Sequence, residues 1–568
     1  MPEYASQRSM MLMTVYVLLL IAVFFRLWQL GTIPGVNGDE AWLGWKAFGV
    51  EHGQKMNWAT NSGNLTNPFY ILPLIGLHEI FQPSVWLLRS VSAISGLLLL
   101  PLNYLICRRA FGPLTAIIST LLFAVLPVNI VYSRFGWEPS QSVLFAVTVL
   151  YVTLILSATR RHLLVCFVLL AGTFVMALIV HPTNSFLFVF AVAGIGARIV
   201  KPEVSARRLV GFFGLLLIGC AVFGFIAVLN APGGVREEIV GRLDGMLWMR
   251  DFRAFLLAWL RMFDGINSLS FVLGSWPRAT ETMFKNPRPY IYWPDSLALI
   301  AFTVSLLAIL NSHRANSKSS DEGKQAQCDK TARMDRVLLA GFLSTSFLFD
   351  ILNGPGKIAV WNDRYGLWMV PAGVLILSRG WVGLLRLFPL RGGLINGCGL
   401  FFCALLLLET WSGYFLYAQK TGGNSGLDVR IGQQEIHMEA AHQLEIAAKT
   451  SGVGHPALIS SDWFAYWPIA YSLMTDRDWK KWETVLEELY PRYRNQGNWD
   501  LLEAVKEGRV AFADFSGSNA WEVWDRVAEE AKITYRKSSI KDVAGRPVLI
   551  VKIPELWFRH TEAPHSSF

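Results

Sequence analysis

The chain has 568 residues, of which 53% are hydrophobic and only 16% charged, against about 25% charged in soluble domains. This composition excludes an ordinary soluble protein. The net charge of +9 does not indicate nucleic-acid binding, because Lys and Arg gather in short loops between long apolar runs, where they act as a topology signal.

Apolar runs near 20 residues long predict transmembrane helices. In chain order we expect them near residues 10–28, 85–106, 113–132, 139–157, 162–180, 183–199, 208–229, 292–311, 336–352, 365–383 and 393–416. The sequence therefore predicts a polytopic α-helical membrane protein with about eleven spans. The first run is too long for a cleaved signal peptide, and no small-residue cleavage site follows it.

The basic residues orient the chain. With the N-terminus in the cytoplasm, the cytoplasmic side receives most of the Lys and Arg of the short loops, including Arg108–Arg109, Arg160–Arg161 and the loop with Arg379, Arg386 and Arg391, as the positive-inside rule requires. The polar inner loop around 317–330 is predicted to be disordered. The outer side receives the long loops 31–84 and 230–291, and an odd number of crossings leaves the C-terminus there.

From residue 420 the composition becomes that of a soluble domain. Helical patterns at 433–449, 479–490 and 498–506 alternate with strand-like runs at 457–460, 510–515 and 547–553. This alternation predicts a small C-terminal α/β domain. We therefore divide the chain into a transmembrane module, residues 1–419, and a soluble domain, residues 420–568. Trp463, Trp467, Trp521 and Trp524 could stack on sugar rings but are interpreted mainly as core residues of this domain.

The unusual polar residues lie at the predicted outer surface. Asp39 and Glu40 stand just beyond the first helix, where a carboxylate can take a proton from a hydroxyl or coordinate a metal. The alternative is an acidic pair at a helix N-terminus, stabilised by the helix dipole.

Further along the chain, Arg134, Glu138, His181, Lys357, Arg364 and Tyr365 fall on the same side. The cations stand where the positive-inside rule disfavours them, and Arg is suited to a bidentate grip on phosphate. The alternatives are that Arg134 pairs with Glu138, that Arg364 pairs with Asp363 or a lipid headgroup, and that His181 is structural. Together these residues predict a site for a substrate with a phosphate head and a lipid tail.

These features resemble a known family, the GT-C fold membrane glycosyltransferases, in particular the group with the protein O-mannosyltransferases and the lipid A aminoarabinose transferase. The resemblance rests on Asp39-Glu40, Pro68-Phe69-Tyr70, Arg89, Ser133-Arg134 and the Arg364-Tyr365-x5-Pro371 pattern. It implies a sugar donor carried on polyprenyl phosphate and reaction at the outer face of the membrane.

The resemblance also implies roles. Asp39 is expected as the catalytic base or as the group that orients the acceptor, and Glu40 assists it or binds the acceptor or a metal. Arg364, Tyr365 and Arg134 are expected to hold the lipid phosphate, with His181 reaching phosphate or sugar; Glu138, Lys357, Lys55 and His52 are further substrate-binding candidates. A divalent metal is left open, because the chain has no dedicated metal motif.

The function predicted is an inverting transfer of a hexose or pentose from a polyprenyl-phosphate donor to a hydroxyl of a cell-envelope glycan, glycolipid or protein. The bilayer, the donor and the acceptor are the expected partners, with no nucleic acid. The expected location is a bacterial inner membrane, with the C-terminal domain periplasmic or extracellular. A polytopic transporter or lipid-glycan flippase and a non-catalytic assembly subunit are the alternatives.

Overall fold

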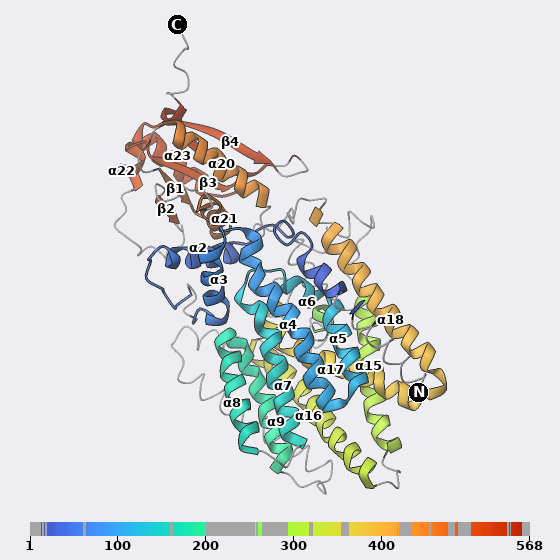
Figure 1. Ribbon diagram of the computed structural model, residues 1–568. Coiled ribbons are helices and arrows are strands. Elements are labelled where there is room, and N and C mark those ends of the chain that lie inside the picture. The colour runs from blue at the N-terminus through green and yellow to red at the C-terminus, as the bar shows by residue number, and fades with distance from the viewer. Residues whose placement is uncertain are drawn as a thin grey trace.

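A computed structural model of the chain shows a bundle of long helices with a sheet-containing C-terminal part at one end (Figure 1). The structure describes residues 13, 16–17, 20–60, 64–158, 163–199, 256, 259–263, 293–316, 322–353, 363–416, 418–419, 434–451, 453, 456–474, 483–486, 501–541, 545 and 547–558. Every predicted span within these residues falls on helical segments. The predicted span 208–229 and most of the outer loop 230–291 lie outside the described residues.

The bundle is built from helices that follow the first helical segment at 20–27. They are α4 (Val85–Phe111), α5 (Pro113–Val125), α6 (Pro127–Tyr132), η1 (Glu138–Gln141), α7 (Ser142–Ala158), α8 (Leu163–Val180), η2 (Pro182–Phe186), α9 (Leu187–Ile199), α15 (Trp293–Asn316), α16 (Glu322–Asn353), η4 (Asp363–Met369), α17 (Val370–Leu387), η5 (Pro389–Arg391), α18 (Gly392–Glu409) and η6 (Thr410–Leu416). Among the described residues, four stretches are long and apolar enough to cross a bilayer: 85–111, 138–158, 364–387 and 389–416. The total of eleven spans stays a prediction.

Two details of the bundle differ from the sequence prediction. The run 113–132 is two helices instead of one, because Pro127 has no N–H to donate and holds Leu126 in an extended conformation (φ −61°, ψ 125°). The polar segment predicted to be disordered is helical from Glu322 onward, as the first part of α16.

Arg379 also differs from the prediction, which placed it in a cytoplasmic loop. It lies inside α17 and donates from Nε (2.9 Å) and Nη2 (2.7 Å) to the carboxylate of Asp335 in α16. Both side chains are at most 3% exposed. Buried charges need a partner, and this ion pair supplies one between two helices of the bundle.

Two short helices cover one end of the bundle, α2 (Gly38–Glu51) and α3 (Pro68–Ile80). Each begins at an asparagine whose side chain accepts a backbone N–H: Asn37 from Asp39, and Asn67 from Phe69. Asn is among the strongest N-cap residues. These caps set the starting points of α2 and α3 and therefore the direction of the side chains in their first turns.

The C-terminal part is a five-stranded sheet between helices. It contains α20 (Gln434–Ser451), β1 (Ala457–Ser460), α21 (Trp463–Met474), β2 (Glu483–Leu486), α22 (Leu501–Lys506), β3 (Val510–Phe515), α23 (Ala520–Ala531), β4 (Tyr535–Lys541), β5 (Pro547–Pro554) and η9 (Glu555–Phe558). The strand order is β2-β1-β3-β5-β4; β2, β1 and β3 are parallel, and β5 is antiparallel to both of its neighbours. Alternate residues of β1 enter two different apolar cores, Leu458 on the face of α20 and α21, and Ala457 and Ile459 on the face of α22 and α23.

One secondary-structure prediction for this part is wrong. The segment 479–490 was expected to be helical, but Glu483–Leu486 form β2, whose backbone pairs in parallel with β1. Pairing with β1 determines the conformation of this segment in spite of its local helical pattern. The core interpretation holds for Trp524, which is 1% exposed, while Trp463 and Trp467 remain partly exposed next to α2.

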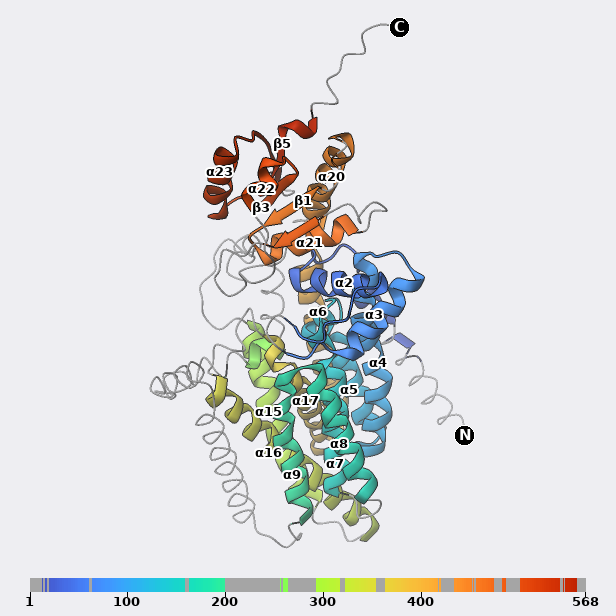
Figure 2. The ribbon, with the colours of Figure 1, turned by 90° about the vertical axis from the view of Figure 1, so that its left-hand side faces the viewer.

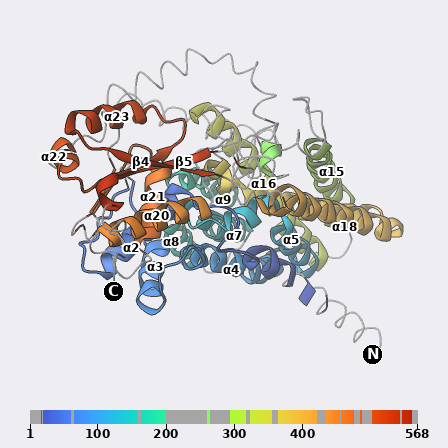
Figure 3. The ribbon, with the colours of Figure 1, turned by 90° about the horizontal axis from the view of Figure 1, so that it is seen from above.

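The C-terminal part rests on the bundle through α21, which lies against α2 in both side views (Figures 1 and 2). Seen from above, the sheet and α2 lie over one side of the bundle and α18 lies at the opposite edge (Figure 3). Gly44 of α2 makes the close approach possible, because a Cβ at this position would meet the ring of Tyr471 at 2.5 Å.

Candidate active site

The site begins with the turn after the first helix, whose backbone carbonyls are held by two buried arginines. Arg134 donates to three of them, Phe25 O at 3.0 Å, Gln29 O at 3.1 Å and Ile33 O at 2.8 Å. A helix leaves its last carbonyls without partners and carries negative charge at that end, so a cation there is favourable. Burial lowers the pKa of Arg134 to about 10, which leaves the guanidinium charged at neutral pH.

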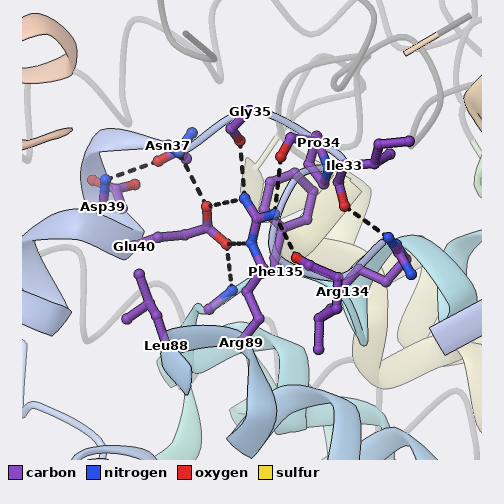
Figure 4. Close-up of polar contacts among 12 residues, drawn as sticks. Ile33, Pro34, Gly35, Asn37, Asp39, Glu40, Leu88, Arg89, Arg134 and Phe135 are labelled. Carbon is purple, nitrogen blue, oxygen red and sulfur yellow. Dashed lines mark hydrogen bonds and ion pairs between the residues drawn. The ribbon is translucent and has the colours of Figure 1, made fainter. Parts of the chain in front are cut away.

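This position decides how Arg134 is interpreted. The side chain is 0% exposed and is aimed at backbone oxygens (Figure 4). Glu138, its expected alternative partner, instead accepts the backbone N–H of Asn67 at 2.8 Å. The alternative in which Arg134 pairs with Glu138 is therefore wrong. The geometry also gives Arg134 a structural role in place of the expected contact with the lipid phosphate.

Glu40 is equally enclosed. Its carboxylate accepts from Arg89 at Oε1 (3.0 Å) and Oε2 (2.8 Å), from the backbone N–H of Gly136 (2.5 Å) and from the backbone N–H of Asn37 (3.0 Å). The last contact completes a capping box with Asn37. With four donors around a 0% exposed side chain, Glu40 matches the alternative considered for the acidic pair, a carboxylate stabilising a helix N-terminus.

Arg89 uses its remaining donors on the same turn. Nη1 donates to the carbonyls of Leu30 (3.0 Å) and Pro34 (2.9 Å), and Nη2 donates to that of Gly35 (2.9 Å). Arg89 therefore connects the turn, the start of α2 and the long helix α4, as Figure 4 shows.

Asp39 lies on the other side of the α2 N-terminus, away from this ion pair (Figure 4). Consecutive helix residues point about 100° apart, so the neighbours Asp39 and Glu40 face different surroundings. Asp39 is partly exposed, and its Oδ1 accepts the indole N–H of Trp463 in α21 at 3.0 Å. The carboxylate expected as the base thus lies at the boundary between the bundle and the C-terminal part.

Lys46 lies two turns after Asp39 on α2 and was not predicted from the sequence. It donates from Nζ to Thr66 Oγ1 (2.6 Å) and lies 4.7 Å from the ring centroid of Trp42. Burial lowers the pKa of Lys46, and the charge of Glu138 opposes part of that shift. The charge of Asp39 also reaches Glu138, so Asp39, Lys46 and Glu138 form one electrostatic group.

A sequence signal for Lys46 existed. Asp39, Trp42 and Lys46 are spaced i, i+3 and i+7, which places them on one face of a helix. Reading the start of α2 as a helix, instead of as a loop, would have brought Lys46 into the site.

The second half of the site is formed where η1, η2 and η4 meet. The guanidinium of Arg364 lies 4.5 Å from the ring centroid of Trp137, which directly precedes Glu138, and its Nη2 donates to Tyr365 Oη at 3.2 Å. No ion pair involves Arg364 among the side chains that the structure describes. A guanidinium stacked on an aromatic ring is suited to an anionic ligand.

His181 belongs to the same group. Its ring lies 5.8 Å from that of Tyr365, and its Nδ1 accepts the backbone N–H of Thr183 at 3.3 Å as the cap of η2. Burial, assisted by the positive charge of Arg364, lowers the pKa of His181 to about 4. The imidazole is therefore neutral near pH 7, so it can offer a ligand a hydrogen bond but no charge.

Two predicted residues are not brought into this group. His52 and Lys55 lie at and beyond the C-terminal end of α2, with His52 about 20 Å along the helix from Asp39. His52 Nδ1 contacts Phe48 O at 2.9 Å, and Lys55 is exposed. Lys357 lies outside the described residues. Within the part of the chain that the structure describes, no three His, Cys, Asp or Glu residues gather to hold a metal ion.

The fold and this site at one end of the bundle define a class, the GT-C membrane architecture that the sequence resembles, and the structural comparison confirms that resemblance at the level of the fold. ArnT from Cupriavidus metallidurans bound to undecaprenyl phosphate has 12% sequence identity and a TM-score of 0.51, with 95% of this chain and 98% of that chain covered. No family model and no curated protein matches the chain.

Two further solved structures share the similarity. ArnT from Cupriavidus metallidurans in the apo state is 13% identical with a TM-score of 0.42, covering 97% of this chain and 99% of that chain. The archaeal oligosaccharyltransferase AglB from Archaeoglobus fulgidus, in complex with an inhibitory peptide and a dolichol-phosphate, is 14% identical with a TM-score of 0.46, covering 98% and 78%. At these sequence identities the similarity concerns the fold alone. The fold assignment rests on the ArnT structure with undecaprenyl phosphate, whose TM-score is 0.51.

Proposed function

We propose that this chain is a membrane glycosyltransferase that moves a sugar from a polyprenyl-phosphate donor to a hydroxyl group at the outer face of the membrane. One observation carries the proposal. A partly exposed carboxylate, Asp39, and an arginine without a described ion pair, Arg364, lie at the same end of the bundle, on either side of the Trp137–Glu138 segment. A base and a phosphate-binding cation are the two groups that such a transfer requires.

The reaction assigns each of them one task. The acceptor oxygen attacks the anomeric carbon of the sugar while the bond from that carbon to the phosphate oxygen breaks. Asp39 takes the proton of the attacking hydroxyl, and Arg364 with Tyr365 stabilises the negative charge that develops on the leaving polyprenyl phosphate. A single displacement inverts the configuration at the sugar carbon, so no second carboxylate is needed as nucleophile.

Glu138, Lys46 and His181 complete the proposed substrate site. Glu138, which the charge of Asp39 reaches, offers an acceptor to sugar hydroxyls, and Lys46, whose charge reaches Glu138, offers a donor. His181 lies next to Tyr365 on the phosphate side. The ArnT structure supports a lipid phosphate in this fold, since that protein is bound to undecaprenyl phosphate. We leave Arg134 and Glu40 out of the substrate site because both side chains are buried. The two Nη atoms of Arg134 donate to backbone carbonyls, and the carboxylate of Glu40 is enclosed by four donors.

The topology proposed from the sequence fits this site. We propose that residues 1–419 form the membrane module, that the soluble domain 420–568 lies on the outer side, and that the membrane is a bacterial inner membrane. Support comes from the packing of α21 on α2, because it puts the C-terminal part at the same end of the bundle as Asp39.

The transporter alternative predicts charges within the spanning helices. The buried Asp335–Arg379 pair is such a charge pair, but its two side chains satisfy one another. A closed ion pair fits helix packing better than a moving ligand, and we therefore favour the enzyme.

The test is a transfer assay with purified protein in liposomes, with polyprenyl-phosphate sugars as donors and release of polyprenyl phosphate as the readout. Asp39→Asn keeps the shape of the side chain and is expected to lower turnover by about 10²–10⁴-fold. Glu51→Gln, on the same helix at its far end, is the matched control and should leave turnover unchanged. Turnover of Asp39→Asn within a few-fold of wild type would remove Asp39 as the base, and movement of donor across the bilayer without transfer would favour the flippase.

A further inference from the structure

The contact between Trp463 and Asp39 joins two parts of the chain that are far apart in sequence. The indole N–H donates to Asp39 Oδ1 at 3.0 Å across a separation of 424 residues. The ring of Trp463 also lies 6.1 Å from that of Trp42, one turn after Asp39 on α2. The C-terminal part therefore contributes a hydrogen-bond donor to the carboxylate that we propose as the base.

The structure holds this donor firmly. Asp462 caps α21, with its Oδ1 accepting the backbone N–H of Phe464 at 2.7 Å. Gly38 allows the first turn of α21 to approach, since a Cβ there would meet the Trp463 and Phe464 rings at 2.9 Å. Further along the helix, the buried Tyr471 donates to the carbonyl of Ser84 at 3.3 Å. The first turn and the far end of α21 are thus both fixed against the bundle.

We infer that Trp463 is a positioning residue for the reaction: its indole N–H fixes the carboxylate of Asp39 in one rotamer and stabilises it in the ionised form that accepts a proton. The inference rests on the proposed function of Asp39. It makes the C-terminal part contribute to the rate of turnover, because without the docked α21 the carboxylate lacks this hydrogen bond. A donor to a carboxylate favours its charged form.

The charged groups around Asp39 come from four elements. They are Lys46 on α2, Glu138 on η1, Asp462 before α21 and the closed pair of Glu40 with Arg89 on α4. A substitution at Trp463 changes none of these charges, so a shift in pH dependence reports the lost indole donor.

The chain offers a matched control, Trp467, on the next turn of the same helix. Its ring lies 5.4 Å from Trp463 and 5.8 Å from Trp45, and its buried Nε1 has no hydrogen-bond partner among the residues that the structure describes. Replacing either tryptophan by phenylalanine removes one indole from the same aromatic contact. Only Trp463→Phe also removes a hydrogen bond to Asp39.

The first experiment compares the two variants in the liposome assay. Trp463→Phe is expected to lower kcat by about tenfold, as for a lost hydrogen bond to a charged group, with KM for the lipid donor within about twofold of wild type. The acid limb of its pH–rate profile should move to higher pH by about one unit. Trp467→Phe should match wild type in all three, and equal behaviour of the two variants would overturn the inference.

A second measurement does not depend on turnover. A carbodiimide reacts with protonated carboxylic acids, so labelling of Asp39, followed by mass spectrometry of the full-length protein after digestion, falls as pH rises. Trp463→Phe should shift the midpoint of labelling to higher pH, and Trp467→Phe should not. An unshifted midpoint for Trp463→Phe overturns the inference. A shifted midpoint in a protein that transfers no sugar supports the contact and refutes the proposed function alone.

Discussion

Glu40 and Arg89 form an ion pair that is closed to solvent, with Arg89 Nη2 2.8 Å from Glu40 Oε2 and both side chains at most 1% exposed. The pair joins the first turn of α2 to α4, and Arg89 also holds three carbonyls of the turn before α2. The position of the next-door Asp39 therefore depends on a charge pair that takes no part in the proposed chemistry.

The first prediction follows from that burial. Glu40→Ala leaves the guanidinium of Arg89 buried without a counter-charge, which is expected to cost about 3–5 kcal/mol of stability. The measurement is equilibrium unfolding of the full chain in mixed micelles. Glu51→Ala is the control, because Glu51 makes only a partly exposed contact of 3.7 Å with His52, worth about 0–1 kcal/mol. A loss for Glu40→Ala as small as that of the control would contradict the buried pair.

The acidic pair shows what the sequence could and could not predict. Its place after the first helix agrees with the structure, where α2 begins soon after that helix, and its place on the outer side stays a prediction. The different roles of Asp39 and Glu40 could not be predicted. They depend on the 100° rotation between neighbouring helix residues and on which side chains and backbone groups surround each carboxylate. Arg89 and the N–H of Gly136 surround Glu40, and neither contact can be derived from the local sequence.

The same limit applies to Arg134 and Trp463. The positive-inside rule identified Arg134 as unusual, but it could not show that backbone carbonyls of residues 25–33 occupy the guanidinium. The contact of Trp463 with Asp39 depends on the docking of α21 on α2. Periodicity places such helices within their own domain and says nothing of how two domains meet.

The second prediction concerns Arg364 and the donor. Arg364→Ala removes the cation that we assign to the phosphate and should weaken binding of undecaprenyl phosphate by about ten- to a hundredfold. Arg364→Lys keeps the charge but loses the planar guanidinium that stacks on Trp137. Its affinity for undecaprenyl phosphate should therefore lie between that of the wild type and that of Arg364→Ala. Binding is measured by titration of nanodisc-embedded protein.

The control for Arg364 is Arg391→Ala. Arg391 is an exposed arginine in η5, beyond the far end of α17 and about 30 Å from η4 along the helix. It should bind the lipid phosphate as wild type does. Equal affinity of Arg364→Ala and Arg391→Ala would exclude Arg364 from the phosphate site.

The third prediction uses the lowered pKa of His181. The folded protein resists protonation of this imidazole until about pH 4, whereas the unfolded chain takes up the proton near its ordinary pKa of 6.5. Between these values the unfolded state binds more protons, so this contribution lowers stability as pH falls from 6.5 toward 4, by roughly 3 kcal/mol in total.

His181→Asn tests this contribution, because Asn does not titrate and still caps η2. The difference in unfolding free energy between wild type and variant should change in the variant's favour as pH falls from 6.5 to 4. Because wild type and variant share all other titrating groups, the contributions of those groups cancel in the difference between the two unfolding free energies at each pH. A difference that stays constant over this range would show that His181 is protonated equally in both states.

The last prediction tests the packing of two bundle helices. At Gly380 of α17, a Cβ would lie 2.2 Å from Cβ and 2.3 Å from Cα of Ser305 in α15, so the helices touch through backbone and have no flexible group to move aside. Gly380→Ala should therefore destabilise the protein by about 1–3 kcal/mol as an overpacked contact. Gly172→Ala in α8 is the matched control, because no atom of the described residues lies within 4 Å of a Cβ added at this position. The higher helix propensity of Ala should make this substitution neutral or stabilising by up to about 1 kcal/mol. The measurement is equilibrium unfolding of both variants in mixed micelles. If α15 and α17 approach as closely as described, Gly380→Ala lowers the unfolding free energy and Gly172→Ala does not. Stabilisation by both substitutions would show that the two helices lie further apart.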